Sequence, residues 1–107
     1  MKALKPATVR SLFAFMRFAS DLVVLKMYAN WCGPCKMLTP TMEHLSDENS
    51  DIKFYEADVD KNKDLVQQLG VSGIPLVLLF KNGTEINRIV GLKLKTDYQE
   101  SINNAKL

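Results

Sequence analysis

The chain contains two stretches in which apolar residues follow one another almost without interruption. Leu22–Ala29 carries a single charge, at Lys26, and Leu76–Phe80 carries none. A run of this kind is typical of a strand, and the first is long enough for a central strand buried on both faces, since a half-exposed strand would alternate apolar and polar residues. We therefore predict a central strand over residues 22–29 and a further strand over 76–80.

Shorter patterns predict the remaining strands. Ile52–Asp58 alternates apolar and polar residues, and Asn82-Gly83 is a strong hairpin signal that leads into a strand over Glu85–Val90. Lys2–Leu4, ahead of Pro6, has the length of a short edge strand. Together with the two apolar runs, these segments predict a sheet of four to five strands.

Four further segments carry helical signals. In the first, apolar residues occupy the i, i+3, i+4 and i+7 positions of one helix face, starting at Val9. The second contains Pro40, which we expect to kink it, and the third is stopped by Gly70. The predicted helices cover Thr8–Phe18, the cysteine segment to about Glu48, Asp60–Leu69 and Thr96–Asn104. The last helix directs Tyr98, Ile102 and Ala105 toward the sheet.

The order of these elements predicts an α/β fold. Strands and helices alternate before a final hairpin and helix, which indicates a mixed central sheet with about four helices on its two faces. At 107 residues the chain is expected to form one domain, 1–107. Its net charge of +2 is small and its basic residues are scattered, which argues against nucleic-acid binding. We expect a monomer without membrane association.

The N-terminal segment has two interpretations. Met1–Ser20 contains four basic residues and no acidic residue, a composition that transit peptides share. We favour a surface helix, because without it one face of the sheet would be uncovered. A secretory signal is disfavoured, since the longest apolar run there, Leu12–Met16, is too short for a signal core or a membrane span. The expected location is therefore the cytoplasm.

The only two cysteines, Cys32 and Cys35, lie directly after the first apolar run. Two thiols separated by two residues face each other when the second lies on the first turn of a helix. The spacing alone also occurs in zinc sites and by chance. A closed zinc site within one chain is disfavoured, because it needs four ligands and the chain offers these two cysteines and one histidine, His44. Merely structural cysteines would leave the strand-then-helix placement unexplained.

In a redox role the two thiols would have different functions. If Cys32 lies at a helix N-terminus, the free N–H groups and the helix dipole stabilise its thiolate, so it would be exposed and reactive. Cys35, one turn further and less exposed, is placed to attack a mixed disulfide formed at Cys32. Pro34 suits the first helical turn, where its missing N–H costs nothing, and Gly33 leaves room for a substrate backbone.

Several motifs of the sequence resemble those of a known protein family. Trp31-Cys32-Gly33-Pro34-Cys35-Lys36 is similar to the active-site signature of the thioredoxin family. Gly73-Ile74-Pro75 and the hairpin after it resemble the family's cis-proline loop, and Ala57–Asp60 and Val90-Gly91 match family segments in order and spacing. The resemblance runs from about Leu22 to the C-terminus.

The resemblance implies the thioredoxin fold and the reduction of disulfides in other proteins, with Cys32 attacking and Cys35 resolving. Pro75 would be cis and face the thiols, and Ile74 would offer backbone groups to an extended substrate segment. Electrons would come from thioredoxin reductase or an equivalent, the substrates would be oxidised proteins, and no metal or organic cofactor is expected. Partners would dock on an apolar patch around Cys32, made of Trp31, Gly33, Pro34, Val59, Gly73, Ile74, Val90 and Gly91.

Two charges depart from the family pattern. A buried aspartate is usual at the position of Lys26, and a lysine is usual where this chain has Glu56. We expect the two to form a reversed ion pair on adjacent strands beneath Cys35, because a lysine in an apolar strand is costly unless paired. Since the family's aspartate is thought to help move the proton of the resolving cysteine, both residues join the cysteines as catalytic candidates, with Glu56 as the proton acceptor.

Two other functional interpretations stay open at the level of sequence. The chain could be a thioredoxin-like binding subunit of a larger enzyme, with incidental redox activity. A thiol oxidase or isomerase of an oxidising compartment is disfavoured by Gly33-Pro34 and by the missing secretory signal.

Overall fold

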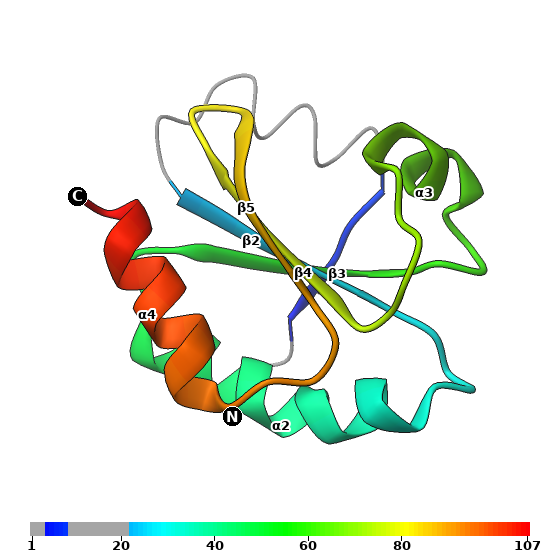
Figure 1. The fold of residues 1–107 in the computed structure, drawn as a ribbon, viewed down its shortest axis with the longest axis horizontal. Helices are drawn as coiled ribbons and strands as arrows, with labels where there is room; N and C mark the ends of the chain where they lie inside the picture. The colour runs from blue at the N-terminus through cyan, green and yellow to red at the C-terminus, as the bar shows by residue number, and fades with distance from the viewer. Residues whose placement is uncertain (1–3, 9–21) are drawn as a thin grey trace.

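A computed structural model describes residues 4–8 and 22–107 of the chain, and in these residues helices cover both faces of a five-stranded sheet (Figure 1). The elements are β1 (Lys5–Pro6), β2 (Leu22–Tyr28), α2 (Gly33–Glu48), β3 (Lys53–Asp58), α3 (Lys63–Leu69), β4 (Leu76–Lys81), β5 (Thr84–Val90) and α4 (Lys95–Ala105).

The sheet is mixed, with the strand order β1-β3-β2-β4-β5. β1 and β2 both run parallel to β3, whereas β4 runs antiparallel to β2 and β5 antiparallel to β4. The nearly continuous apolar sequence of β2 fits its place between β3 and β4, where helices cover both of its faces. The register of β2 and β3 sets Lys26 opposite Glu56.

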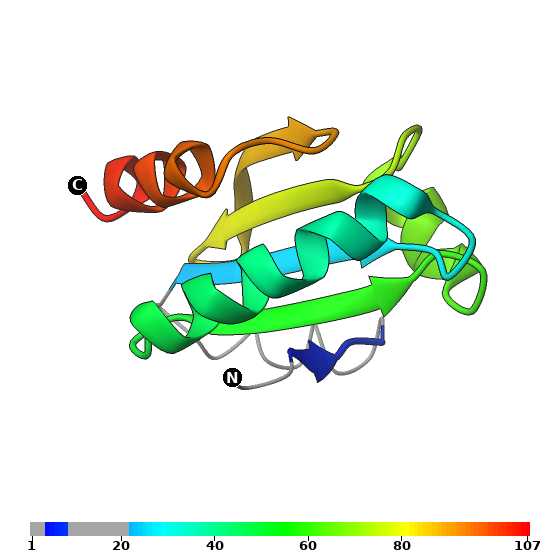
Figure 2. The same ribbon diagram turned by 90° about the horizontal axis from the view of Figure 1, so that it is seen from below.

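Alternate residues of β2 contribute to two separate cores. Val24 packs in the core that α2 and α4 share, and Val23 and Leu25 pack on the opposite face with Leu65 of α3. Figures 1 and 2 show this layering, with α2 and α4 on one side of the sheet and α3 on the other. Lys26 shares the face of Val24 and therefore lies beneath α2.

Turn residues end the elements where the sequence predicted. Gly70 closes α3 in the left-handed conformation, with φ of 63°, a conformation that strains most residues with a Cβ but not glycine. Asn82 and Gly83 both have positive φ, as a two-residue hairpin between β4 and β5 requires.

Two expectations about the fold are corrected, and a third falls on residues that the structure does not describe. β1 is Lys5–Pro6 and not Lys2–Leu4: Leu4 is not in a strand, and residues 2 and 3 lie outside the described residues. Pro6 is tolerated in β1 because an edge strand leaves one side unpaired. The predicted helix Thr8–Phe18 falls almost wholly outside the described residues, which form three helices instead of about four.

The second predicted helix is confirmed as α2, which continues through Pro40 to Glu48.

Within the described part of the chain, no helix is long and apolar enough to cross a membrane.

Candidate active site

Cys32 and Cys35 form a disulfide at the N-terminus of α2, with their Cα atoms 5.2 Å apart. Cys32 is the N-cap residue, in extended conformation, and its Sγ accepts a hydrogen bond from the Cys35 backbone N–H at 3.2 Å. The Pro34 ring occupies the first turn, where no intrahelical N–H donor is needed. The predicted placement of Cys32 at the helix start is therefore confirmed.

The expectation that Cys32 is exposed is wrong for the disulfide form. The exposed fraction is 7% for Cys32 and 2% for Cys35. Cys32 is covered because its sulfur is bonded to Cys35 and because Ala29, Tyr28 and Ile74 pack around the pair. The order of exposure of the two cysteines is nevertheless the predicted one.

The loop between α3 and β4 packs against the disulfide. The Ile74-Pro75 peptide bond is cis, as predicted, and Ile74 packs against the cysteines. The Gly91 N–H donates to the Pro75 carbonyl at 2.8 Å, which joins this loop to the end of β5. A Cβ on Gly73 would lie 3.4 Å from Val90 Cγ1, so the two positions are in close approach.

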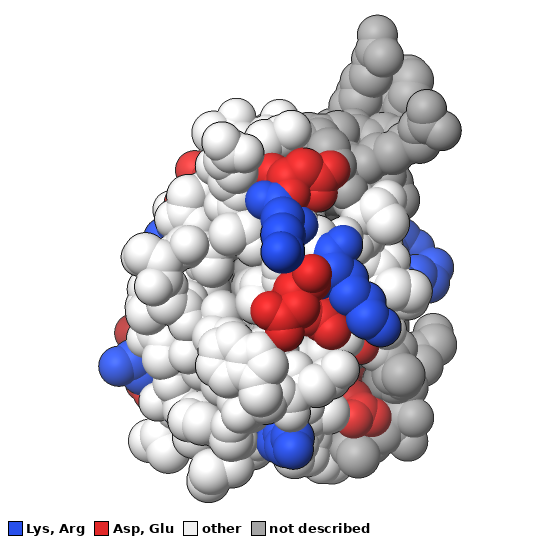
Figure 3. All heavy atoms as spheres, turned by 90° about the vertical axis from the view of Figure 1, so that its right-hand side faces the viewer, with Lys and Arg blue, Asp and Glu red and all other residues white. Residues whose placement is uncertain are grey.

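Val59 and Trp31 complete the surface around Cys32. The Val59 N–H donates to the Tyr28 carbonyl at 2.8 Å, and Val59 packs against the cysteine pair. Trp31 is 70% exposed, and its indole Nε1–H donates to Asp60 Oδ2 at 2.7 Å. Figure 3 faces this end of the molecule and shows charged side chains gathered over part of it, beside a broad uncharged area. The sequence did not identify the role of Asp60, although it lies in a segment that matched the family.

The predicted ion pair is present beneath the disulfide. Lys26 Nζ lies 3.3 Å from Glu56 Oε1, and the lysine is 2% exposed while the glutamate is 28% exposed. Lys26 Nζ also donates to Thr39 Oγ1 at 3.4 Å, and that hydroxyl donates to the Cys35 carbonyl at 3.3 Å. The ammonium lies 5.0 Å from the centre of the Tyr28 ring, a cation–π distance. Thr39, which no sequence pattern singled out, thus links the ion pair to the resolving cysteine.

A small hollow connects this pair to the surface. It has a volume of about 140 Å³, large enough for a few waters, and Cys35, Lys26, Thr39 and Glu56 are among its lining residues. Burial, together with Glu56 and Asp58, raises the pKa of Tyr28 at its edge, so this phenol stays protonated at neutral pH. Among residues 4–8 and 22–107, no three His, Cys, Asp or Glu side chains are grouped so as to hold a metal ion.

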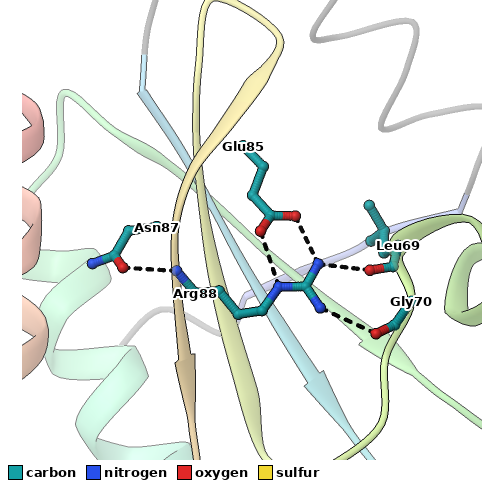
Figure 4. Close-up of polar contacts among 5 residues, drawn as sticks. All are labelled: Leu69, Gly70, Glu85, Asn87 and Arg88. Carbon is teal, nitrogen blue, oxygen red and sulfur yellow. Dashed lines mark hydrogen bonds and ion pairs between the residues drawn. The ribbon is translucent and has the colours of Figure 1, made fainter.

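Arg88 of β5 holds the start of the cis-proline loop (Figure 4). Its guanidinium donates to both carboxylate oxygens of Glu85, at 2.9 and 2.7 Å. It also donates to the Gly70 carbonyl at 3.1 Å and to the Leu69 carbonyl at 2.6 Å, while its own backbone N–H donates to Asn87 Oδ1 at 2.8 Å. The loop that carries Pro75 is therefore fixed at both ends, at Gly70 by Arg88 and at Pro75 by Gly91.

Tyr98 of α4 fixes the segment after β5. Its phenol donates to the Gly91 carbonyl at 3.1 Å and accepts from the Lys93 backbone N–H at 3.1 Å. Burial is the main cause that raises the pKa of this phenol. The sequence predicted the inward direction of Tyr98 correctly, but its polar role had no local signal.

The chain matches the thioredoxin family model over residues 6–104. It is 45% identical over 85 residues to the thioredoxin of Chlamydia caviae, which covers 79% of this chain and 83% of that protein. It is 49% identical over 70 residues to Thioredoxin-1 of Saccharomyces cerevisiae, covering 65% and 68%. The fold matches the crystal structure of oxidized mitochondrial thioredoxin 3 from S. cerevisiae with a TM-score of 0.87 and 29% identity over 94% of each chain.

Proposed function

Because this chain belongs to the thioredoxin family and is a protein-disulfide oxidoreductase, we propose that Cys32 attacks substrate disulfides and that Cys35 resolves the resulting mixed disulfide. The observation that carries this assignment is the position of Cys32 as the N-cap of α2. There the free N–H groups of the first turn and the helix dipole favour a thiolate over a thiol. The Cys35 N–H, which contacts Cys32 Sγ, is one of these donors.

The reaction transfers two electrons from the dithiol to the substrate. The Cys32 thiolate attacks one substrate sulfur, so that a mixed disulfide forms and the first substrate thiolate leaves. The Cys35 thiolate then attacks Cys32 Sγ, which restores the Cys32–Cys35 disulfide and releases the second substrate thiolate. A partner reductase returns two electrons and two protons. Reductases and disulfide-containing proteins are the partners that the family implies in general, and none of these steps requires a metal or an organic cofactor.

Glu56 is proposed as the acceptor of the Cys35 proton. The carboxylate is partly exposed, it lines the same hollow as Cys35, and Lys26 holds it in place through their ion pair. Water in that hollow could carry the proton from sulfur to carboxylate and then to solvent. The ammonium of Lys26 favours the thiolate at Cys35 through its field. Lys26 and Glu56 would thus act on the second step and not on the attack by Cys32.

The surface around Cys32 is proposed to bind an extended segment of the substrate. Free backbone groups at Ile74 would pair with such a segment beside the cis proline. Trp31, Val59 and Val90 would cover its apolar side chains. Gly33, Pro34, Gly73 and Gly91 leave space for its backbone, because none of them projects a long side chain toward Cys32.

Single-cysteine variants test the assigned roles. With insulin as the disulfide substrate, Cys32→Ser and Cys35→Ser should both abolish turnover, but only Cys35→Ser should accumulate a mixed disulfide, detectable by mass spectrometry. Brief alkylation of the reduced wild-type protein near neutral pH should label Cys32 first. Preferential labelling of Cys35, or trapping by Cys32→Ser, would contradict the assignment. No observation favours the alternative of a binding subunit with incidental redox activity.

We further propose that the protein acts as a monomer in the cytoplasm. A dithiol donor has to be kept reduced, and the cytosolic glutathione and thioredoxin systems do so. Acid-quenched cells followed by alkylation should yield mainly the reduced protein in the cytosolic fraction. Sedimentation should give the mass of one chain, and an oxidised pool in a secretory fraction would contradict the proposed location.

A further inference from the structure

A groove with exposed apolar side chains lies between α2 and the segment that joins β5 to α4. It has a volume of about 500 Å³. Three large apolar side chains in it face solvent, with exposed fractions of 66% for Met37, 38% for Leu92 and 72% for Leu94. Its lining residues are Met37, Thr41, Leu92, Lys93, Leu94, Lys95 and Asp97. Both cores are complete without these three side chains, so packing does not account for their position.

The backbone of the groove is already held in place. The buried phenol of Tyr98 binds the Lys93 N–H, and Asp97 Oδ2 accepts from the Leu94 N–H at 3.0 Å. Lys95 forms an ion pair with Glu48 at the end of α2, which joins the two walls. A ligand would therefore meet an ordered surface, and little conformational entropy would be lost on binding. Since Asp97 and Lys95 are engaged within the protein, the apolar side chains are the main part of the groove left for a ligand.

The groove adjoins the surface around the disulfide at Leu92. Leu92 directly follows Gly91, whose N–H binds the Pro75 carbonyl beside the cysteines. Met37 follows Cys32 by five positions on α2, which is about 7.5 Å along the helix axis. An extended chain advances about 3.3 Å per residue, so a segment joined to Cys32 has to extend at least about two or three residues from its own cysteine to reach the groove.

We propose that this groove binds an apolar side chain of the same substrate segment whose cysteine is joined to Cys32. The protein then prefers disulfide substrates that carry a large apolar residue, such as leucine, about two or three residues from the reacting cysteine. This proposal rests on the attack by Cys32 proposed above and adds a second contact to it. A second contact raises kcat/KM for substrates that make it and leaves the sulfur chemistry unchanged.

Matched peptides test the preference. Each peptide carries one cysteine as a mixed disulfide with thionitrobenzoate, and either leucine or serine at positions two and three on each side of the cysteine in turn. At the productive position the leucine peptide should react with a kcat/KM about tenfold higher, since part of a leucine side chain leaves water. In Met37→Gln/Leu94→Gln, the ratio between the two peptides should fall to about one. Leu107→Gln, which changes a 96% exposed leucine outside the groove, should keep the wild-type ratio.

The outcomes separate this proposal from the function on which it rests. A wild-type ratio of one at every position, or a ratio that survives in the double variant, would overturn the groove as a substrate contact. Failure of the wild type to reduce either peptide, or reduction that persists in Cys32→Ser, would instead overturn the proposed function. Sedimentation at the assay concentration should give a monomer, and a dimer that Met37→Gln/Leu94→Gln dissociates would assign the groove to a second copy of the chain.

Discussion

Two ion pairs in this molecule have opposite surroundings. Lys26–Glu56 lies beneath the disulfide with a single contact of 3.3 Å, and its lysine is 2% exposed. Arg88–Glu85 lies at the rim with two contacts, and both side chains are about one-third exposed. The exposed pair has the better geometry, yet water can solvate both of its charges when the pair is broken, so the pair contributes little to stability. Burial and not the number of bonds should therefore decide which pair the fold depends on.

Removing the carboxylate of the buried pair should have the largest effect. Glu56→Ala leaves the buried Lys26 ammonium without its counter-charge. Breaking a buried pair in this way costs about 3 kcal/mol, the lower end of the usual range, because Glu56 is itself partly exposed. Chemical denaturation of the oxidised protein measures this loss. Glu48→Ala breaks a third ion pair, the solvent-exposed one between Glu48 and Lys95. It serves as the control and should cost less than about 1 kcal/mol.

Substitution of Tyr98, whose phenol is neutral, should cause the second-largest loss of stability, larger than substitution of the charged Arg88. Tyr98→Phe leaves the Gly91 carbonyl and the Lys93 N–H without their partner, at a cost of about 1–3 kcal/mol. The loosened segment should also raise KM for protein substrates more than it lowers kcat. Tyr28→Phe, which keeps the aromatic ring at the end of β2 and removes only its hydroxyl, provides the matched control. Equal stability of the two variants would show that the Tyr98 bonds contribute little.

Alkaline pH tests the same phenol without a mutation. The pKa of Tyr98 is raised in the folded protein, mainly by burial. The Tyr98 phenol of the unfolded protein therefore loses its proton at a lower pH than the phenol of the folded protein. The stabilisation that this phenol provides is fully present below about pH 10, and it is lost as the pH rises toward the pKa of the folded protein. Denaturation between pH 9 and 11 should show a steeper loss of stability for wild type than for Tyr98→Phe. Parallel curves would contradict this.

Exchanging the two charges of the buried pair tests whether the pair affects the redox potential. Lys26 favours thiolates near it and so stabilises the reduced form, which should make the potential less negative than the roughly −270 mV typical of thioredoxin. Lys26→Asp/Glu56→Lys restores the usual family arrangement and should shift the potential to more negative values. Equilibration with glutathione measures it. If neither the potential nor the pH profile of Cys35 reactivity moves, the reversed pair has only a structural role.

The exposed pair should give the smallest effect. Arg88→Lys retains the charge but loses the fork that holds Glu85 and the two carbonyls of Leu69 and Gly70. We expect a cost of about 1 kcal/mol, since water can solvate the freed groups. Because the cis-proline loop starts at Gly70, KM should rise slightly while kcat stays near the wild-type value. A loss of stability as large as that of Glu56→Ala would reverse the ranking proposed here.

The sequence predicted the buried pair and missed the exposed one for a physical reason. Lys26 interrupts an apolar run, and a charge there demands a partner on a neighbouring strand, so Glu56 could be found. Arg88 and Tyr98 bind backbone atoms of other segments, and such contacts leave no periodic signal in the chain. The bond between Trp31 and Asp60 escaped prediction in the same way.

Local signals predicted boundaries well where they fixed the backbone. The Asn82-Gly83 turn and the Gly70 helix end are confirmed because positive φ values require such residues. The edge strand was placed wrongly, since two residues paired to β3 have no pattern of their own. The burial of Cys32 could not be read from its helix position, because packing by Tyr28, Ala29 and Ile74 determines it.

The two edges of the sheet limit how this protein can meet other chains. β1 consists of two residues, one of them Pro6, which lacks an N–H donor. β5 carries Glu85 and Arg88, and its pairing with β4 shifts register between Leu79 and Phe80. β1 is too short, and β5 too charged and irregular, to offer a flat row of hydrogen-bonding groups on which an incoming strand could grow. Such edges disfavour edge-to-edge pairing with other chains, so the substrate contacts proposed above lie at loops and helix ends and not along the sheet edges.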